Sequence, residues 1–199
     1  GLKAGIPVVM GASDTALESY AVGGLKPGDC VLKMASAGGI NVFRNVGAPF
    51  KDTFAYSHVV EGMWYYGRGN VSAAQALRSY RDTFCQKEIA EEQAGGPNTY
   101  QILDKEAEAV PPGANGLFFH PYMSGERAPY WDTKLRASFT GFSSLHTRGH
   151  FNRAILEGVT FSLRQCFDIM EEFGAIEKIS FVGGGAKSPL WRSILADVF

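Results

Sequence analysis

Apolar residues recur along the chain at two spacings, which together predict an α/β fold. Short apolar runs predict buried strands at 6–12, 30–34, 40–43, 117–120 and 179–182. Apolar pairs around Glu61-Gly62, at 59–60 and 63–66, predict a hairpin. Helical spacing predicts helices at 15–22, from about 72 to a break at 95–98, and at 147–173, with a terminal helix after residue 188. The 147–173 helix is apolar around most of its circumference, so we expect it to be buried against a sheet. No repeat or linker divides the pattern, which indicates one domain.

Composition narrows the classes of partner. The 199 residues are 45% hydrophobic and 20% charged, and 19 basic and 20 acidic residues give a net charge of −1. This balance gives no bulk attraction to nucleic acid or anionic lipid, so phosphate binding would need a local site. No apolar run approaches the roughly 20 residues that span a bilayer. We therefore expect no nucleic-acid or membrane partner.

Cysteine and histidine spacing indicates a reduced, cytoplasmic protein without a metal site of its own. The three cysteines are far apart and odd in number, and the four histidines lack metal-ligand spacing. The chain starts at Gly1 rather than Met, and its last helix is still running at Phe199. We therefore expect a piece of a longer protein, cut at both ends.

Three loops of small residues each follow an apolar strand and predict phosphate binding. They are Gly11-Ala-Ser-Asp14, Ala35-Ser-Ala-Gly-Gly39 and Gly183-Gly-Gly-Ala-Lys-Ser188. Ligands of α/β sheets collect beyond the carboxyl ends of strands, and glycine lets backbone N–H groups approach a phosphate closely. The start of a following helix adds favourable dipole charge.

Each loop also has a plainer interpretation. Asp14 is either a general base, a role worth roughly 10²–10⁴-fold in rate, or a helix cap, and pattern alone favours the cap. The second loop is either a phosphate turn or an ordinary β-turn, which pattern alone favours. The third is no Walker A loop, because Ala186 precedes Lys187 and Phe181 stands where the first glycine belongs. A hydrolase elbow is excluded because Thr15 replaces its last glycine.

Four ordered blocks resemble the FGGY family of carbohydrate kinases, specifically the C-terminal domain and most closely its xylulokinase-like branch. The blocks are residues 5–14, 122–132, 137–157 and 182–197. The resemblance implies an actin-like, ribonuclease-H-like α/β domain with a mixed sheet and helices on its faces. This nucleotide-binding domain would fill residues 1–199, truncated at both ends, without the N-terminal sugar-binding domain.

The resemblance also implies the chemistry, which is ATP-dependent phosphorylation of a small-molecule sugar or polyol with Mg²⁺ shielding the phosphates. Asp14 would be the general base, and Asp14 and Thr15 would contact the substrate. Ala74 and Arg78 share a helical face that would line the nucleotide. The nucleotide-binding residues implied are Ser36, Ala37, Gly38, Gly39, Ala74, Arg78, Gly184 and Gly185. The identity of the sugar and a homodimeric state stay open.

Departures from the family pattern keep alternatives open. Ser36-Ala-Gly38 stands where the family has Gly-Thr-Ser, and Thr15 replaces an Asn or Gln. A nucleotide-binding regulator or degenerate kinase is therefore the second hypothesis, and an actin-like or chaperone-type ATPase the third. We expect little or no kinase activity from the isolated chain. Glu126 and Arg127 are expected to pair, either near the cleft or structurally, and Trp131 and Trp191 to be packing residues.

Overall fold

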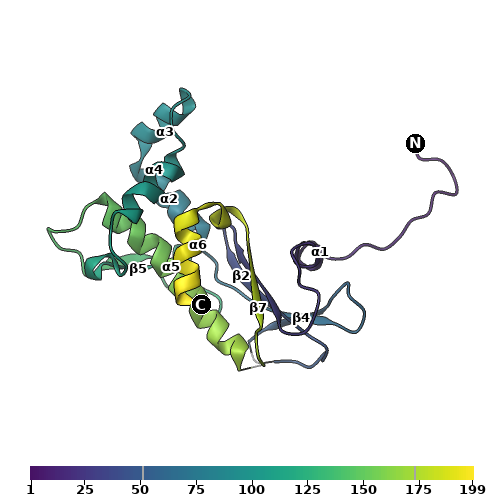
Figure 1. Ribbon diagram of the computed structural model, residues 1–199. Coiled ribbons are helices and arrows are strands. Elements are labelled where there is room, and N and C mark those ends of the chain that lie inside the picture. The colour runs from purple at the N-terminus through teal and green to yellow at the C-terminus, as the bar shows by residue number, and fades with distance from the viewer. Residues whose placement is uncertain (51, 173) are drawn as a thin grey trace.

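The computed structural model describes residues 1–50, 52–172 and 174–199, and its main feature is a mixed five-stranded sheet (Figure 1). The strand order is β3-β4-β2-β1-β7, with β1 and β7 parallel and the other neighbours antiparallel. The strands are β1 (Asp29–Met34), β2 (Gly38–Arg44), β3 (Phe54–Ser57), β4 (Trp64–Arg68) and β7 (Lys178–Val182). A separate pair joins β5 (Phe118–His120) and β6 (Ser138–Thr140).

Helices cover both faces of the sheet. They are α1 (Asp14–Ala21), α2 (Ala74–Phe84), α3 (Gln86–Gln93), α4 (Thr99–Glu108), α5 (Arg148–Glu171) and α6 (Pro189–Val198), with short 3₁₀ turns η1 (Ala114–Gly116) and η2 (Gly184–Lys187). Alternate residues of β1 face opposite sides. Leu32 belongs to the large core with α5, and Val31 to a smaller core with Ala16 of α1 and Phe43. The expected α/β class is confirmed.

Helix α5 is the central element of the large core. Most of its residues are buried, as its all-round apolar pattern predicts, and it contacts α2, α4, α6 and two strands. His150 Nδ1 accepts from the Thr147 backbone N–H at 3.0 Å and fixes the helix start. The predicted C-terminal end of this helix at Phe173 lies outside the described residues.

The strand predicted at 6–12 is wrong. Val8, Val9 and Met10 are 96%, 83% and 97% exposed, and the segment leads away from the domain (Figure 1). A strand needs partners for its backbone N–H and C=O groups, and none of the residues in the described ranges pairs with this segment. Apolar composition alone therefore does not make it a strand here.

Other boundaries need correction. The hairpin exists, but its first strand is β3, because 58–63 form the turn: His58 N donates to Met63 O at 2.9 Å. The helix predicted from 72 to 95 is two helices that meet at Cys85. Helix α4 and strand β6 were not predicted, since α4 buries few apolar residues and β6 is short.

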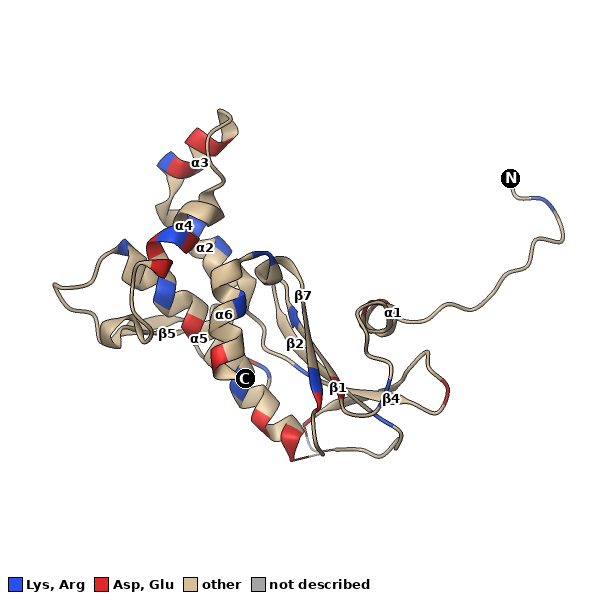
Figure 2. Cartoon of the chain, in the orientation of Figure 1, with Lys and Arg blue, Asp and Glu red and all other residues tan. Residues whose placement is uncertain are grey.

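Charged residues of both signs are mixed along the helices α3, α4 and α5 (Figure 2), consistent with the near-zero net charge. Within the described ranges, no helix combines the length and apolar character that crossing a membrane requires.

Candidate functional site

The turn between β1 and β2 is joined directly to the start of α2. Ala35 N donates to Ala37 O at 3.1 Å, which closes the turn. The turn's carbonyls then accept from the helix start, Ala73 N to Ser36 O at 2.8 Å and Ala74 N to Ala35 O at 2.9 Å. Gln75 N also donates to Ser36 O at 3.2 Å, so three N–H groups at the start of α2 are already paired with protein. The helix dipole still points at the turn, but these groups are occupied.

Gly38, the first residue of β2 after this turn, has no room for a side chain. An added Cβ would lie 2.2 Å from Asn70 Oδ1 and 2.8 Å from Leu163 Cδ2. Its N–H donates to Asn70 O at 3.3 Å. Gly38 is therefore a close-packing glycine, whereas its neighbour Gly39, only half-buried, meets one atom at 3.9 Å.

The glycine triplet lies against the same turn. Because β7 runs parallel to β1, their carboxyl ends meet at one edge of the sheet. Gly183 has a φ of +98°, and an added Cβ would lie 2.4 Å from Met34 O. A Cβ on Gly185 would lie 2.3 Å from Met34 Cγ, whereas Gly184 is exposed and would meet nothing within 4 Å. The triplet is thus packed on one side and open on the other.

The helix after the triplet is anchored in the core. Ser188 Oγ accepts from Trp191 N at 3.0 Å and caps α6. The Trp191 indole is buried and donates to Thr160 Oγ1 on α5 at 3.0 Å. The predicted packing role is confirmed for Trp191. It is wrong for Trp131, which is 53% exposed.

Asp14 is not the cap of α1. Ser13 takes that position, with Oγ accepting from Ala16 N at 3.3 Å and lying 3.2 Å from the Tyr65 hydroxyl. Asp14 is the first helical residue, and its exposed carboxylate accepts from Thr15 N at 2.7 Å through Oδ1. Thr15 Oγ1 lies 3.4 Å from the same oxygen. The carboxylate is therefore open to solvent.

Helix α1 approaches the sheet edge from the other face. Its Ala16 is buried against Val31 and Phe43, and Glu18 pairs with Lys33, one residue before the end of β1. No hydrogen bond or ion pair in the described part of the chain joins Asp14 to the turn or the triplet. The structure thus brings the turn, the α2 start and the triplet together, and leaves Asp14 on a separate element.

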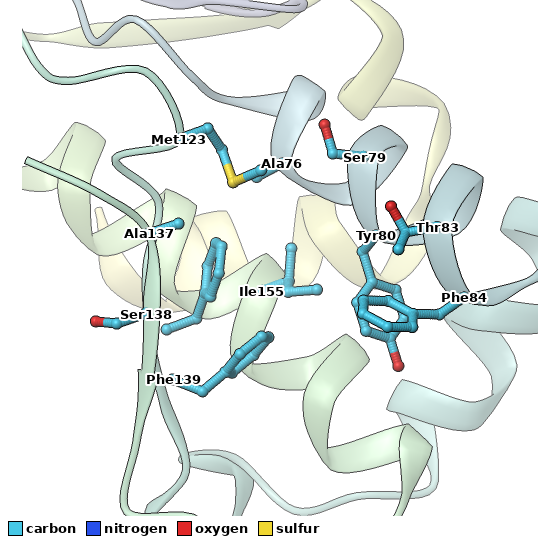
Figure 3. Close-up of a pocket in the computed structure, with 11 residues that line it drawn as sticks. Ala76, Ser79, Tyr80, Thr83, Phe84, Met123, Ala137, Ser138, Phe139 and Ile155 are labelled. Carbon is cyan, nitrogen blue, oxygen red and sulfur yellow. The ribbon is translucent and has the colours of Figure 1, made fainter.

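The two predicted residues of α2 lie on one side of that helix. Ala74 is half-buried at its first turn and Arg78 is exposed one turn later. With about 100° per residue, Ala76 and Tyr80 lie on the opposite side. There they line an apolar groove of about 200 Å³ that α2 forms with Phe139 and its neighbours (Figure 3). This groove is distinct from the predicted nucleotide-lining face.

Sequence reasoning missed the roles of Asn70 and Glu126. Glu126 makes no ion pair with the Arg127 guanidinium among the described ion pairs; instead its carboxylate accepts from backbone N–H groups. Burial raises the pKa of the Glu126 carboxyl, although those N–H groups oppose the rise. The loop around Glu126 is crowded with polar and aromatic residues, so no signal in the sequence marks this acid as buried. Within the described residues, no cluster of three or more His, Cys, Asp or Glu could hold a metal ion.

Comparisons with known proteins agree on one family. Residues 44–199 match the model of the "FGGY family of carbohydrate kinases, C-terminal domain". The whole chain is 36% identical to a gluconokinase of Bacillus licheniformis, over 39% of that protein, and 98% of it is 34% identical to a xylulose kinase of Lactococcus lactis, over 37% of that protein. The chain thus spans about two fifths of the length of these relatives.

Solved structures give the same result. The xylulose kinase of Rhodospirillum rubrum superposes with a TM-score of 0.85 at 31% identity, covering 98% of this chain and 38% of that one. A Plasmodium falciparum glycerol kinase solved with ADP superposes with a TM-score of 0.74, covering 92% of this chain and 36% of that one. Its 16% identity shows a shared fold alone.

Proposed function

Because the chain belongs to the FGGY family of carbohydrate kinases, we propose that it is the nucleotide-binding part of an enzyme that phosphorylates a sugar or polyol hydroxyl with ATP. We assign residues 1–199 to the C-terminal domain and place most sugar contacts in an N-terminal domain of the complete protein. The observation that carries the proposal is the meeting of the β1–β2 turn, the α2 start and the glycine triplet at one sheet edge.

Exposed and closely packed positions at this edge support the proposal. The backbone at Gly184 is open to an approaching ligand, while Gly183 and Gly185 hold the loop against Met34. Ser36 is exposed at the tip of the turn, and Arg78 is exposed on the same side of α2 as Ala74. We propose that 36–39 lie against the terminal phosphates, that Gly184 and Gly185 approach the adenosine or α-phosphate, and that Ala74 and Arg78 line the nucleotide.

Asp14 is the proposed general base. Since Ser13 caps α1, the Asp14 carboxylate does not serve as the helix cap, and it is exposed. In this position Asp14 would take the proton of the attacking hydroxyl, which would raise the rate roughly 10²–10⁴-fold. Thr15 would contact the same substrate. Magnesium, carried mainly on phosphate oxygens, would neutralise their charge. Asp14 is the one carboxylate among the proposed site residues.

The test is Asp14→Asn in the complete protein, with Glu61→Gln, an exposed carboxylate in the β3–β4 turn, as the matched control. Turnover should fall about 100-fold or more in Asp14→Asn, while ADP affinity measured by calorimetry stays within about twofold and the control matches wild type. Turnover retained in Asp14→Asn would remove this residue from the mechanism.

A nucleotide-binding regulator or degenerate kinase is the second candidate. Two features favour it: the turn lacks the threonine hydroxyl expected at its centre, and N–H groups of α2 are already bonded to turn carbonyls. ADP release measured over a broad panel of sugars and polyols separates the candidates. ATP binding without sugar-dependent ADP release would establish the regulator, and hydrolysis that needs no sugar would establish an ATPase.

A further inference from the structure

We propose that Glu126 is a positioning residue for the β1–β2 turn, which it holds in place by fixing the connection between β4 and α2. The functional part of this inference rests on the proposed nucleotide site, whereas its structural part stands on the contacts alone. Glu126 lies in the loop after β5, 55 positions from the connection that it holds.

The Glu126 carboxylate is 3% exposed and joins two segments of backbone. Its Oε1 accepts from Val71 N and from Arg127 N, both at 2.7 Å. Hydrogen bonds to a carboxylate in a buried setting are stronger than those between neutral groups. Val71 is thereby fixed to a loop that belongs to neither β4 nor α2.

Val71 lies between two attachment points of the turn. On one side, Asn70 O accepts from Gly38 N at 3.3 Å, and on the other, Ala73 N donates to Ser36 O at 2.8 Å. The carboxylate therefore holds the middle of a short segment whose two ends are both bonded to the turn.

The connection between β4 and α2 is also packed closely against the first residue of β2. An added Cβ on Gly69 would lie 2.2 Å from Gly38 O. The Asn70 side chain is fully buried, and its Nδ2 donates to Ser162 Oγ on α5 at 3.0 Å. Because close-packed elements transmit displacement, movement of Val71 would move Gly38 and the turn that we assign to the phosphates.

A second buried carboxylate supplies a matched control. Glu157 on α5 is 5% exposed, accepts from Gly113 N at 3.1 Å and pairs with Arg153 at 2.6 Å. It too holds a backbone N–H group, but in the segment before η1. Its loss should destabilise the fold without altering the turn.

The experiment compares Glu126→Ala, Glu126→Gln and Glu157→Ala in the complete protein by amide hydrogen exchange and by ADP titration. Glu126→Ala should speed exchange at Gly38, Ala73 and Ala74 and weaken ADP binding, each about tenfold or more. Both N–H bonds go to one oxygen, which a glutamine carbonyl can replace without its charge, so Glu126→Gln should speed exchange less than Glu126→Ala does. Glu157→Ala should lower the melting temperature and leave these three amides unchanged.

The outcomes separate positioning from general stability. Unchanged exchange at the three amides in Glu126→Ala, or equal acceleration in Glu157→Ala, would overturn the inference. Should Glu126→Ala fail to fold, Glu126→Asp, which keeps the charge but shortens the reach, takes its place with the same expected exchange. If wild type binds no ADP, the proposed function fails, and the exchange data still decide whether Glu126 positions the turn.

Discussion

The two groups of proposed site residues have contrasting surroundings. At the sheet edge, Gly38, Gly183 and Gly185 are held by neighbours so close that a methyl group would collide with them. Asp14 begins a helix that follows an exposed segment, and Gly11 beside it would meet nothing within 4 Å. The half of the proposed site that we assign to the phosphates is thus held by packing within the chain, whereas no packing this close among the described residues surrounds Gly11.

The largest effect should come from breaking the packed half. Gly183→Ala would place a side chain at φ +98° and 2.4 Å from Met34 O, and should lower the free energy of unfolding by about 2–4 kcal/mol. Gly184→Ala in the same loop and Gly11→Ala beside Asp14 should each change it by less than about 0.5 kcal/mol. Urea denaturation of the three variants measures this, and equal losses in all three would contradict the contrast.

A middle-sized effect separates Ser13 from Asp14. Ser13→Ala removes the cap of α1 and should cost about 1 kcal/mol of unfolding free energy. Asp14→Asn should cost less than half as much, because among the described bonds its carboxylate accepts only from the N–H and hydroxyl of the next residue, Thr15. If Asp14→Asn proved the more destabilising, Asp14 would have a structural role after all. Thermal and urea unfolding of the pair give the comparison.

The smallest effect concerns the ion pair that joins α1 to β1. Both side chains of Lys33 and Glu18 are 37% exposed, so Glu18→Gln should cost at most about 1 kcal/mol at low salt, and less as salt is raised. Unfolding measured at two ionic strengths tests this. A large, salt-independent loss would mean that α1 is held more tightly than its contacts indicate.

Sequence pattern predicted the strands that are buried on the sheet and failed where burial was absent. The runs at 30–34 and 179–182 form β1 and β7, which pair with each other in the sheet. The run at 6–12 has a similar composition, but it is exposed and pairs with no strand among the described residues. Helix α4 escaped prediction because its apolar contribution to the core is small, Leu103 and Ala107. The spacing of apolar residues shows which structure a segment could form, and the neighbours it packs against decide whether it forms that structure.

The proposed site also has parts that the sequence predicted and parts that it did not. Glycine-rich runs after two strands predicted close backbone approach at the β1–β2 turn and at residues 183–185, because only small residues fit where backbones approach closely. The bonds from the α2 start to the turn, and from Glu126 to Val71, join segments far apart or use backbone atoms. Such bonds leave little trace in the identity of the residues, so Asn70 and Glu126 could not be assigned their roles beforehand.

The parallel pairing of β1 with β7 has a consequence for how the protein is made. Val31 lies opposite Ser180, 149 positions later (180 minus 31). At about 5–20 residues per second, the ribosome needs roughly 7–30 s to add the partner strand. Until then β1 has a bare edge, and the triplet that completes the proposed nucleotide site does not yet exist. We expect this edge to be the last part of the domain to form during synthesis, and the part most open to wrong strand pairing meanwhile.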